Sequence, residues 1–327
     1  FFKVPRPFLQ KEDVVYYTTK MTRDQKQKLI TIIGPTASGK SDLGIKLARK
    51  FNGEIISADS RQVYREMDIG TGKITKKDQR LVRHYLLDVA NPKKVFTVSD
   101  FKYLGEKAIK EILIKNKVPF IVGGTGLYVD TLVYDLNFTQ VLPDKLFRLN
   151  LNKLTAEQLF HKLKNLDPQR AKTIDRHNKR RLIRALEIID SIGKVPYLNT
   201  KYDIHNTKYD VLWLGLKPKN IEKRIKLRLD KRLKQGMVRE VRKLLAQSVS
   251  KKRLYGFGLE YRWVSRYLNK EIDHKEMKGG LLREIIKYSK RQMTWFKRNK
   301  QIHWINPPAG GQKEAEKLIK KFISPLP

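Results

Sequence analysis

An eight-residue stretch, GPTASGKS at residues 34–41, has the composition and spacing of a phosphate-binding loop. It matches the pattern GxxxxGK[ST], in which backbone N–H groups of a glycine-rich loop surround an anion. Lys40 is placed to reach terminal phosphate oxygens, and Ser41 is placed to offer its hydroxyl to Mg²⁺. Most loops of this kind hold ATP or GTP, but a diphosphate on another molecule suits the same chemistry.

A nucleotide-hydrolysing enzyme also needs a strand that ends in Asp and holds the metal through water. The strand predicted from residue 118 ends instead in Gly123, Gly124 and Thr125. Asp88 follows two leucines in HYLLDVA, but that apolar run is short. These features weaken nucleotide hydrolysis as the function and leave a small-molecule kinase open.

Asp59 and Ser60 follow another predicted strand, GEIISA. One interpretation is a turn or a helix N-cap, the usual role of Asp and Ser after a strand. The other is a carboxylate that faces the phosphate loop, either as a general base or as a support for a metal. Thr125 adds a hydroxyl toward the same region, although a turn with a helix cap explains it equally well.

The charge of the chain favours a polyanionic partner. Lys and Arg number 71 against 33 Asp and Glu, which gives a formal net charge of +38 and a pI of about 10.2. Phosphates neutralised by such a surface release counterions, so nucleic acid is the expected ligand. A lysine-rich proteome is the alternative explanation.

One predicted helix carries Arg180, Arg181 and Arg184. These arginines form either a solvated face or a phosphate clamp.

Several classes of protein are excluded or disfavoured. The chain has no cysteine, which excludes disulfides, Cys-ligated zinc and Cys nucleophiles. No apolar run approaches the ~20 residues that cross a bilayer, so we expect no membrane segment and a cytoplasmic protein. Residues 1–27 show no signal-peptide pattern and are expected to form an arm of unknown role.

The pattern of elements predicts an α/β fold. Apolar runs at residues 28–33, 53–58, 118–123, 209–217 and 301–305 are expected strands, and helical patterns at residues 40–51, 99–115, 220–235 and 280–300 separate them. Such alternation indicates a P-loop NTPase-like parallel sheet flanked by helices, with ligands at the carboxyl ends of the strands.

The strand signals stop in the middle of the chain. Two amphipathic helices are expected there, at residues 155–167 and 176–193, with Thr155 as an N-cap and Gly193 after the second helix. We therefore predict a first part of the core at residues 28–140 and a helical insertion domain at 141–207. Residues 208–327 complete the core and carry basic C-terminal helices.

Taken in order, GPTASGKS, SADSRQVYREMDIGTGK, IVGGTGLY, RRLIRALE and KRQMTWFKR resemble the motifs of the tRNA dimethylallyltransferase, or tRNA isopentenyltransferase, family. The resemblance runs from residue 28 to residue 300. It implies that the loop holds the diphosphate of dimethylallyl diphosphate, with Mg²⁺ as cofactor. It implies transfer of the five-carbon group to the N6 amine of adenosine 37 in tRNAs, with release of pyrophosphate.

The resemblance also implies roles for individual residues. Asp59 is the expected general base, Thr125 bonds the departing oxygen, and Lys40 and the N–H groups of residues 36–41 stabilise charge on pyrophosphate. Ser41 is the expected metal ligand. Diphosphate binding is expected from Gly34, Pro35, Thr36, Ala37, Ser38, Gly39, Lys40, Ser41 and Arg262. Contacts to tRNA are expected from Asp59, Ser60, Arg61, Gln62, Thr125, Arg148, Arg180, Arg181, Leu182, Ile183 and Arg184.

This chain departs from the family's pattern around Arg262, because it has LYGFGLEYRWV where many members have a Gly-Tyr-Arg run. The resemblance further implies that the insertion domain at 141–207 serves tRNA, that the partner is the anticodon stem-loop, and that the adenosine is extruded into the cleft. We expect a monomer. Three alternatives remain: an adenylate isopentenyltransferase, a P-loop small-molecule kinase, and a nucleotide-switched RNA-binding protein. The basic surface is not needed by the first of these. The absence of Cys places the chain with bacterial or organellar members.

Overall fold

A parallel β-sheet forms the centre of the protein in a computed structural model, which describes residues 26–136, 138–139, 141–196, 207–306 and 310–324. Its strands are paired in parallel in the order β3-β2-β4-β1-β5-β6. They are β1 (Lys28–Ile33), β2 (Gly53–Ala58), β3 (His84–Tyr85), β4 (Val118–Gly123), β5 (Asp210–Leu216) and β6 (His303–Ile305). The predicted α/β fold is confirmed, and the two-residue β3 is the strand that the sequence pattern missed. The proposed arm lies almost entirely outside the described residues.

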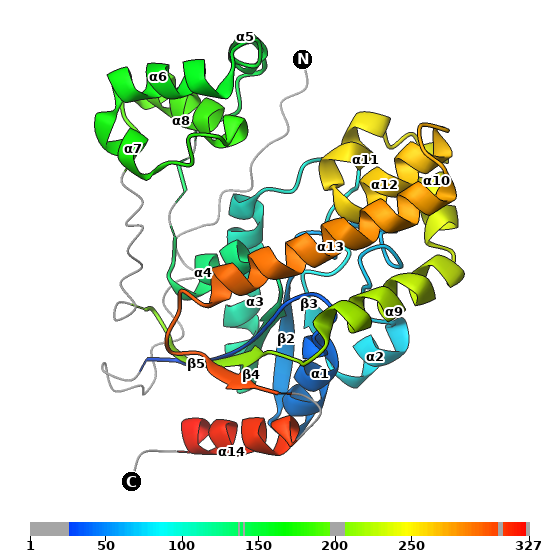
Figure 1. Cartoon of the computed structure of the whole chain (residues 1–327). Helices are drawn as coiled ribbons and strands as arrows, with labels where there is room; N and C mark the ends of the chain where they lie inside the picture. The colour runs from blue at the N-terminus through cyan, green and yellow to red at the C-terminus, as the bar shows by residue number, and fades with distance from the viewer. Residues whose placement is uncertain (1–25, 137, 140, 197–206, 307–309, 325–327) are drawn as a thin grey trace, which may run out of the picture.

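Helices cover both faces of the sheet (Figure 1). Ile30 and Ile32 of β1 pack with α1 (Lys40–Lys50) and α14 (Gly311–Ile323) on one face. Leu29 and Ile33 pack with α3 (Val98–Ile114) and α4 (Gly126–Val133) on the other. A strand buried on both sides is apolar at successive positions, which explains the continuous run in the sequence. The short α2 (Lys76–Leu81) lies beyond α1.

The insertion is a separate group of helices with its own core, seen in green in Figure 1. It contains α5 (Lys145–Leu151), α6 (Ala156–Leu166), α7 (Pro168–Thr173) and α8 (Lys179–Ile192). Thr155 caps α6 through a reciprocal bond pair with Gln158, and α8 ends at Gly193, whose φ is 79°. Both boundary residues are as predicted, while α5 and α7 were not anticipated.

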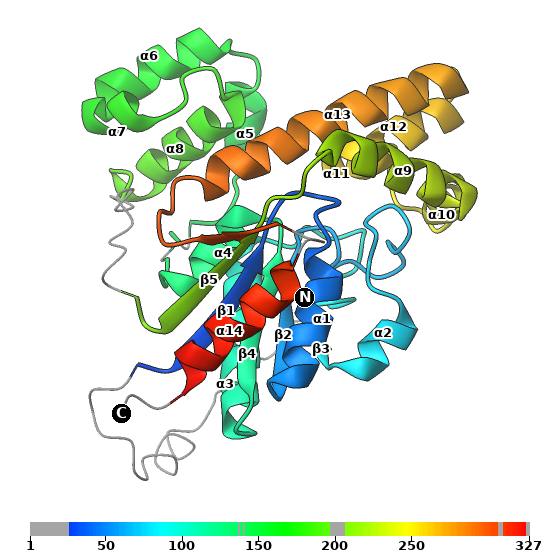
Figure 2. The same cartoon turned by 60° about the horizontal axis from the view of Figure 1, so that its bottom comes forward.

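A second helical layer, here called the helical cap, lies over the carboxyl ends of the strands (Figures 1 and 2). It comprises α9 (Ile221–Lys234), α10 (Met237–Ala246), α11 (Lys251–Phe257), α12 (Leu259–Leu268) and the first half of α13 (His274–Phe296). Helix α9 lies where the sequence pattern predicts it, and α10 to α12 were not anticipated. Helix α13 begins earlier than the expected residue 280, because Asp273 and Glu276 form a capping box at its first turn.

Glu187 of α8 joins the elements of the insertion. Its carboxylate, 3% exposed, accepts hydrogen bonds from Arg148 at 2.7 Å twice, from Arg184 at 2.5 Å and from Asp144 N–H at 2.8 Å. Burial by itself raises the pKa of Glu187, but the bonds from Arg148, Arg184 and Asp144 together bring the pKa below its ordinary value of 4.5. Folding of the insertion therefore favours the ionised form of Glu187 over the protonated form.

We predict that Glu187→Gln lowers the free energy of unfolding by about 1–3 kcal/mol at pH 7, because a buried charged acceptor is lost. A carboxylate whose pKa is lower in the folded state stabilises the protein at pH values above its unfolded-state pKa. This stability is lost as pH falls through its folded-state pKa. The difference between variant and wild type should therefore shrink as pH falls below 4.5. Denaturant unfolding followed from pH 7 to about pH 3 measures this difference. Glu157→Gln on exposed α6 is the matched control, and an equal loss there would contradict the role of Glu187.

Candidate active site

The phosphate loop joins the end of β1 to the start of α1. Gly39 caps the helix with a φ of 91°, a left-handed conformation that favours glycine. The N–H groups of Lys40 and Ser41 belong to the first turn and have no acceptor within their own helix. Because such a helix start carries partial positive charge, it favours an anion in front of it.

Two N–H groups of the loop are engaged within the protein. Thr36 N–H donates to Oε1 of Gln292 at 2.8 Å, and Ser38 N–H donates to the Pro35 carbonyl at 3.2 Å. This corrects the expectation that every N–H group from residue 36 to residue 41 stabilises pyrophosphate. The groups at the helix start fit that role better.

A cavity of about 320 Å³ lies between the phosphate loop, the segment after β2 and the helical cap. Nine of the residues predicted for the site line it: Thr36, Lys40, Ser41, Asp59, Ser60, Arg61, Gln62, Arg180 and Arg262. An adjoining cavity of about 500 Å³ shares Lys40 and Ser41 and is lined by residues 37–39 of the loop. Residues from the loop, the segment after β2, the insertion and the cap therefore meet at one place.

Asp59 caps the turn after β2, and its carboxylate also lines the cavity. Its Oδ1 accepts hydrogen bonds from the N–H groups of Arg61 at 2.8 Å and Gln62 at 3.3 Å, which is the turn-capping role. Its Oδ2 receives no hydrogen bond from the described part of the chain. The carboxylate lines both the main cavity and a small recess with Lys40 and Ser41. One oxygen thus fixes the side chain while the other is available for chemistry.

The two residues after Ser60 shape the wall of the cavity. Arg61 donates through Nε to the Phe257 carbonyl at 2.8 Å and through Nη1 to the Ser60 carbonyl at 3.1 Å. Gln62 is buried and accepts from the Ser57 hydroxyl at 3.3 Å. Arg61 therefore ties the segment after β2 to the end of α11.

Thr125 lies at the start of α4, next to the Asp59 segment. Its Oγ1 accepts from Ser60 N–H at 3.1 Å, and the Tyr288 side chain of α13 lies nearby. Burial and then the charge of Asp59 raise the pKa of Tyr288 to about 12, so its phenol is neutral. Thr125 and Tyr288 place two hydroxyls beside Asp59.

Cations gather on the side of the phosphate loop. Burial, and next the charge of Arg228, lower the pKa of Lys40 to about 8, although Asp59 acts in the opposite direction. Burial and the charge of Arg232 likewise lower the pKa of Arg228 to about 10. Arg224 lies on the same helix and donates to the Ala37 carbonyl at 2.8 Å. An anion bound at the loop would relieve the repulsion among these groups.

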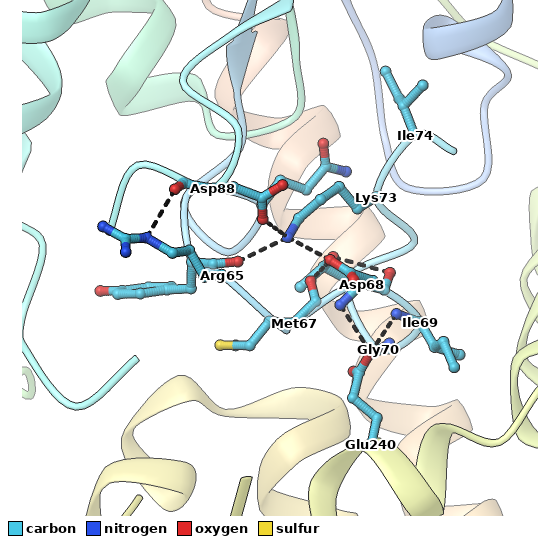
Figure 3. A network of polar contacts seen from close by, with 12 residues as sticks. Arg65, Met67, Asp68, Ile69, Gly70, Lys73, Ile74, Asp88 and Glu240 are labelled. Atoms are coloured by element: carbon cyan, nitrogen blue, oxygen red, sulfur yellow. Dashed lines mark hydrogen bonds and ion pairs between the residues drawn. The ribbon is translucent and has the colours of Figure 1, made fainter. Parts of the chain in front are cut away.

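Glu240 of α10 holds the loop at residues 67–74 (Figure 3). Its carboxylate accepts from the N–H groups of Asp68 at 2.8 Å, Ile69 at 2.6 Å and Gly70 at 3.0 Å. The Gly70 carbonyl in turn accepts from Arg232 at 2.5 Å. A carboxylate in the cap therefore sets the backbone that orients a cation in the cavity wall.

Lys73 holds the same loop from the other side (Figure 3). Its side chain is 2% exposed, and Nζ donates to the Tyr64 carbonyl at 2.7 Å and to carboxylates of Asp68 at 2.6 Å and Asp88 at 2.5 Å. Asp88 also pairs with Lys76 at 3.1 Å. Asp88 therefore acts as a structural partner of lysines, which agrees with the doubt about a hydrolytic metal motif in HYLLDVA.

The predicted tRNA contacts of the insertion divide into three groups. Arg180 lines the main cavity and Arg181 is exposed. Arg148 and Arg184 lie partly exposed and bind Glu187. The remaining two, Leu182 and Ile183, pack in the core of the insertion. This corrects the expectation for that pair, whose side chains do not face solvent.

Arg262 of α12 lines the main cavity and forms an ion pair with Glu284 at 3.2 Å. Glu284 also accepts a hydrogen bond from the indole of Trp263. The assignment of Arg262 to the diphosphate stays a prediction, since its present partner is a carboxylate of the cavity wall.

The donor set suits a hard cation that is shared with a phosphate ligand. Among the described residues, no group of three or more His, Asp or Glu side chains could hold a metal ion by itself. The Ser41 hydroxyl and the Asp59 carboxylate line the same recess. Mg²⁺ commonly binds through one or two protein oxygens, several waters and substrate phosphates, so these residues fit it.

Sequence reasoning missed two rows of residues that face the cavity. Arg224, Arg228 and Arg232 recur every four residues on α9, and Glu284, Tyr288 and Gln292 do so on α13. A spacing of four places side chains on one face of a helix, and this signal could have identified both rows.

The described helices include none with the length and apolar character needed to cross a bilayer.

Comparison with known proteins places the chain in one family. The IPP transferase family model matches residues 62–299. A tRNA dimethylallyltransferase of Alkaliphilus oremlandii is 38% identical over 288 residues, which cover 86% of this chain and 92% of the relative.

Solved structures give the same result. The tRNA isopentenylpyrophosphate transferase of Bacillus halodurans superposes with a TM-score of 0.68 at 34% identity, covering 90% of this chain and 96% of that one. A eukaryotic dimethylallyltransferase acting on tRNA superposes with a TM-score of 0.77 at 25% identity, covering 92% and 80%. With matching motifs, fold and cavity, this chain belongs to the tRNA dimethylallyltransferase family.

Proposed function

We propose that this protein transfers the dimethylallyl group from dimethylallyl diphosphate to the N6 amine of adenosine 37 in tRNAs. The observation that carries the proposal is a single cavity in which Lys40 and Ser41 of the phosphate loop lie with Asp59 and with Arg180 of the insertion. The Asp59 carboxylate then lies between the proposed diphosphate site and the basic surface proposed to bind nucleic acid.

The leaving group is stabilised on the loop side of the cavity. As the bond between the allylic carbon and the diphosphate oxygen breaks, negative charge develops on pyrophosphate. Lys40, Arg228 and the N–H groups at the start of α1 are fixed donors for that charge, and fixed donors act most strongly in the transition state. Mg²⁺, held by the Ser41 hydroxyl and diphosphate oxygens, would neutralise part of the same charge.

The acceptor amine is activated on the other side. As the N6 nitrogen bonds to the allylic carbon, it must lose one proton, and Oδ2 of Asp59 is the acceptor that we propose. Oδ1 is fixed by Arg61 and Gln62 N–H groups, which orients the carboxylate for this transfer. Thr125, with its hydroxyl next to Ser60 N–H, is proposed to bond the departing oxygen.

The insertion, residues 141–207, is proposed to bind the anticodon stem-loop, and the core at residues 28–140 and 208–327 to carry the chemistry. Arg180 and Arg181 are the exposed cations of α8, and Arg180 reaches the cavity. An adenosine in a single-stranded loop costs the least to extrude, about a few kcal/mol. The protein is proposed to act as a monomer.

Incubation of the protein with Mg²⁺, labelled dimethylallyl diphosphate and unmodified tRNA tests the proposal, with AMP and ATP as parallel acceptors. Label on tRNA alone supports it. Label on AMP or ATP would assign the chain to adenylate isopentenyl transfer. ATP consumption without prenyl transfer would favour the kinase alternative and overturn the proposal.

Asp59→Asn should reduce kcat by about 10²–10⁴-fold, because the amide cannot accept the proton. It keeps the oxygen that caps the turn, so tRNA affinity should stay within about threefold. Single-turnover kinetics with a tRNA-binding assay measure both. A variant that loses tRNA affinity but keeps kcat would show that Asp59 binds the acceptor instead of activating it.

Replacing Arg180 and Arg181 together by Ala should weaken tRNA binding and reduce the slope of log K against log salt by about 2, one for each phosphate contact. Arg184 is unsuitable for this test, because it also binds Glu187. Lys313→Ala with Lys317→Ala on α14, where both lysines are exposed, removes the same charge as a control. An unchanged slope in the arginine variant, or an equal change in the control, would argue against a specific contact.

The affinity for dimethylallyl diphosphate should fall as pH rises above about 8, the pKa of Lys40. Lys40 loses its positive charge there, whereas Arg228, with a pKa of about 10, keeps its own. The expected loss is up to about tenfold per pH unit. Calorimetric titration with the diphosphate between pH 7 and pH 9.5 measures it, and Lys40→Met should bind weakly with little dependence on pH.

A further inference from the structure

Gln292 of α13 lies between the two halves of the proposed site. Its side chain is buried, with 6% exposed, and its amide makes two hydrogen bonds to backbone. Oε1 accepts from Thr36 N–H of the phosphate loop at 2.8 Å, and Nε2 donates to the Gly124 carbonyl at 2.8 Å. One side chain therefore links the loop for the diphosphate to the turn that carries Thr125.

The chain of contacts continues to the segment that holds the general base. Gly124 precedes Thr125, and Oγ1 of Thr125 accepts from Ser60 N–H at 3.1 Å, next to Asp59. The backbone around Gly124 approaches α13 closely, because a Cβ at Gly124 would overlap the Gln292 amide and one at Gly126 would overlap the Trp295 ring. These glycines let the turn around Thr125 pack directly against α13.

We propose that Gln292 is a positioning residue that holds the diphosphate loop and the Thr125 turn in register for the transfer, an inference that rests on the proposed function. A displacement of about 1 Å between reacting groups can reduce a rate about 10²-fold. The loop carries the diphosphate, and the turn carries Thr125, whose Oγ1 accepts from Ser60 N–H next to the proposed general base Asp59. A link between them therefore acts on the chemical step more than on the binding of either substrate.

The chemistry of this link requires a primary amide of this length. It must accept from Thr36 N–H and donate to the Gly124 carbonyl at the same time. A Glu side chain could still accept from Thr36 N–H, but its second carboxylate oxygen would lie against the Gly124 carbonyl and repel it. Met has a similar shape and can form neither bond well. The motif KRQMTWFKR thus has a physical reason for Gln at its third position.

Gln292→Met and Gln292→Glu test the inference, with Thr294→Met on the exposed side of the same helix as the control. Both Gln292 variants should lower the single-turnover rate of prenyl transfer by about 10- to 100-fold. In Gln292→Met, KM for dimethylallyl diphosphate and the tRNA Kd should change less than about threefold. Thr294→Met should behave like wild type.

Other outcomes would overturn the inference. If Gln292→Met keeps the wild-type rate within twofold, the link does not control the chemical step. If the rate loss is matched by equal losses in substrate affinity and thermal stability, Gln292 is a packing residue. Should Gln292→Met fail to fold, Gln292→Glu must still show the selective loss of rate. Wild-type protein assayed in parallel separates the two proposals, because its inactivity would refute the function itself.

Discussion

The gathering of cations beside one half-buried loop is the constraint on which the rest of the site depends. Lys40, Arg228 and Arg232 repel one another, and burial makes their charges more costly. The protein compensates with fixed oxygens: the Gly70 and Gly72 carbonyls and the Glu260 carboxylate accept from the two arginines. These acceptors hold the cations in place, and a diphosphate bound at the loop would supply negative charge that offsets their repulsion.

Holding those oxygens requires elements beyond the sheet. The loop at residues 67–74 is fixed by Glu240 from the helical cap and by Lys73 from within the loop (Figure 3). Helix α13 has its first half in the core of the cap and its last residue, Phe296, in the core of the sheet. The cap is therefore part of the active site, and its helices supply one wall of the cavity and the supports behind it.

The insertion follows a different principle. Its core is separate, and the buried Glu187 uses two of its arginines for internal ion pairs. The exposed cations that remain on α8 begin at Arg180, next to the cavity. The arginines of the insertion thus have two roles. Those near the buried Glu187 stabilise the insertion, and those without a buried carboxylate beside them face solvent.

The sequence by itself determined the phosphate loop, five of the six strands, the Asp59 segment and the order of the core around an insertion. These features are local: a motif of eight residues, apolar runs and capping residues carry their own signal. The tertiary structure alone decided which polar residues meet. Gln292 bonds Thr36 from 256 positions away, and Glu240 fixes a loop about 170 positions before it. The inward turn of Arg148 and the burial of Leu182 were equally undetermined, because a residue type and its spacing do not state which distant group lies opposite.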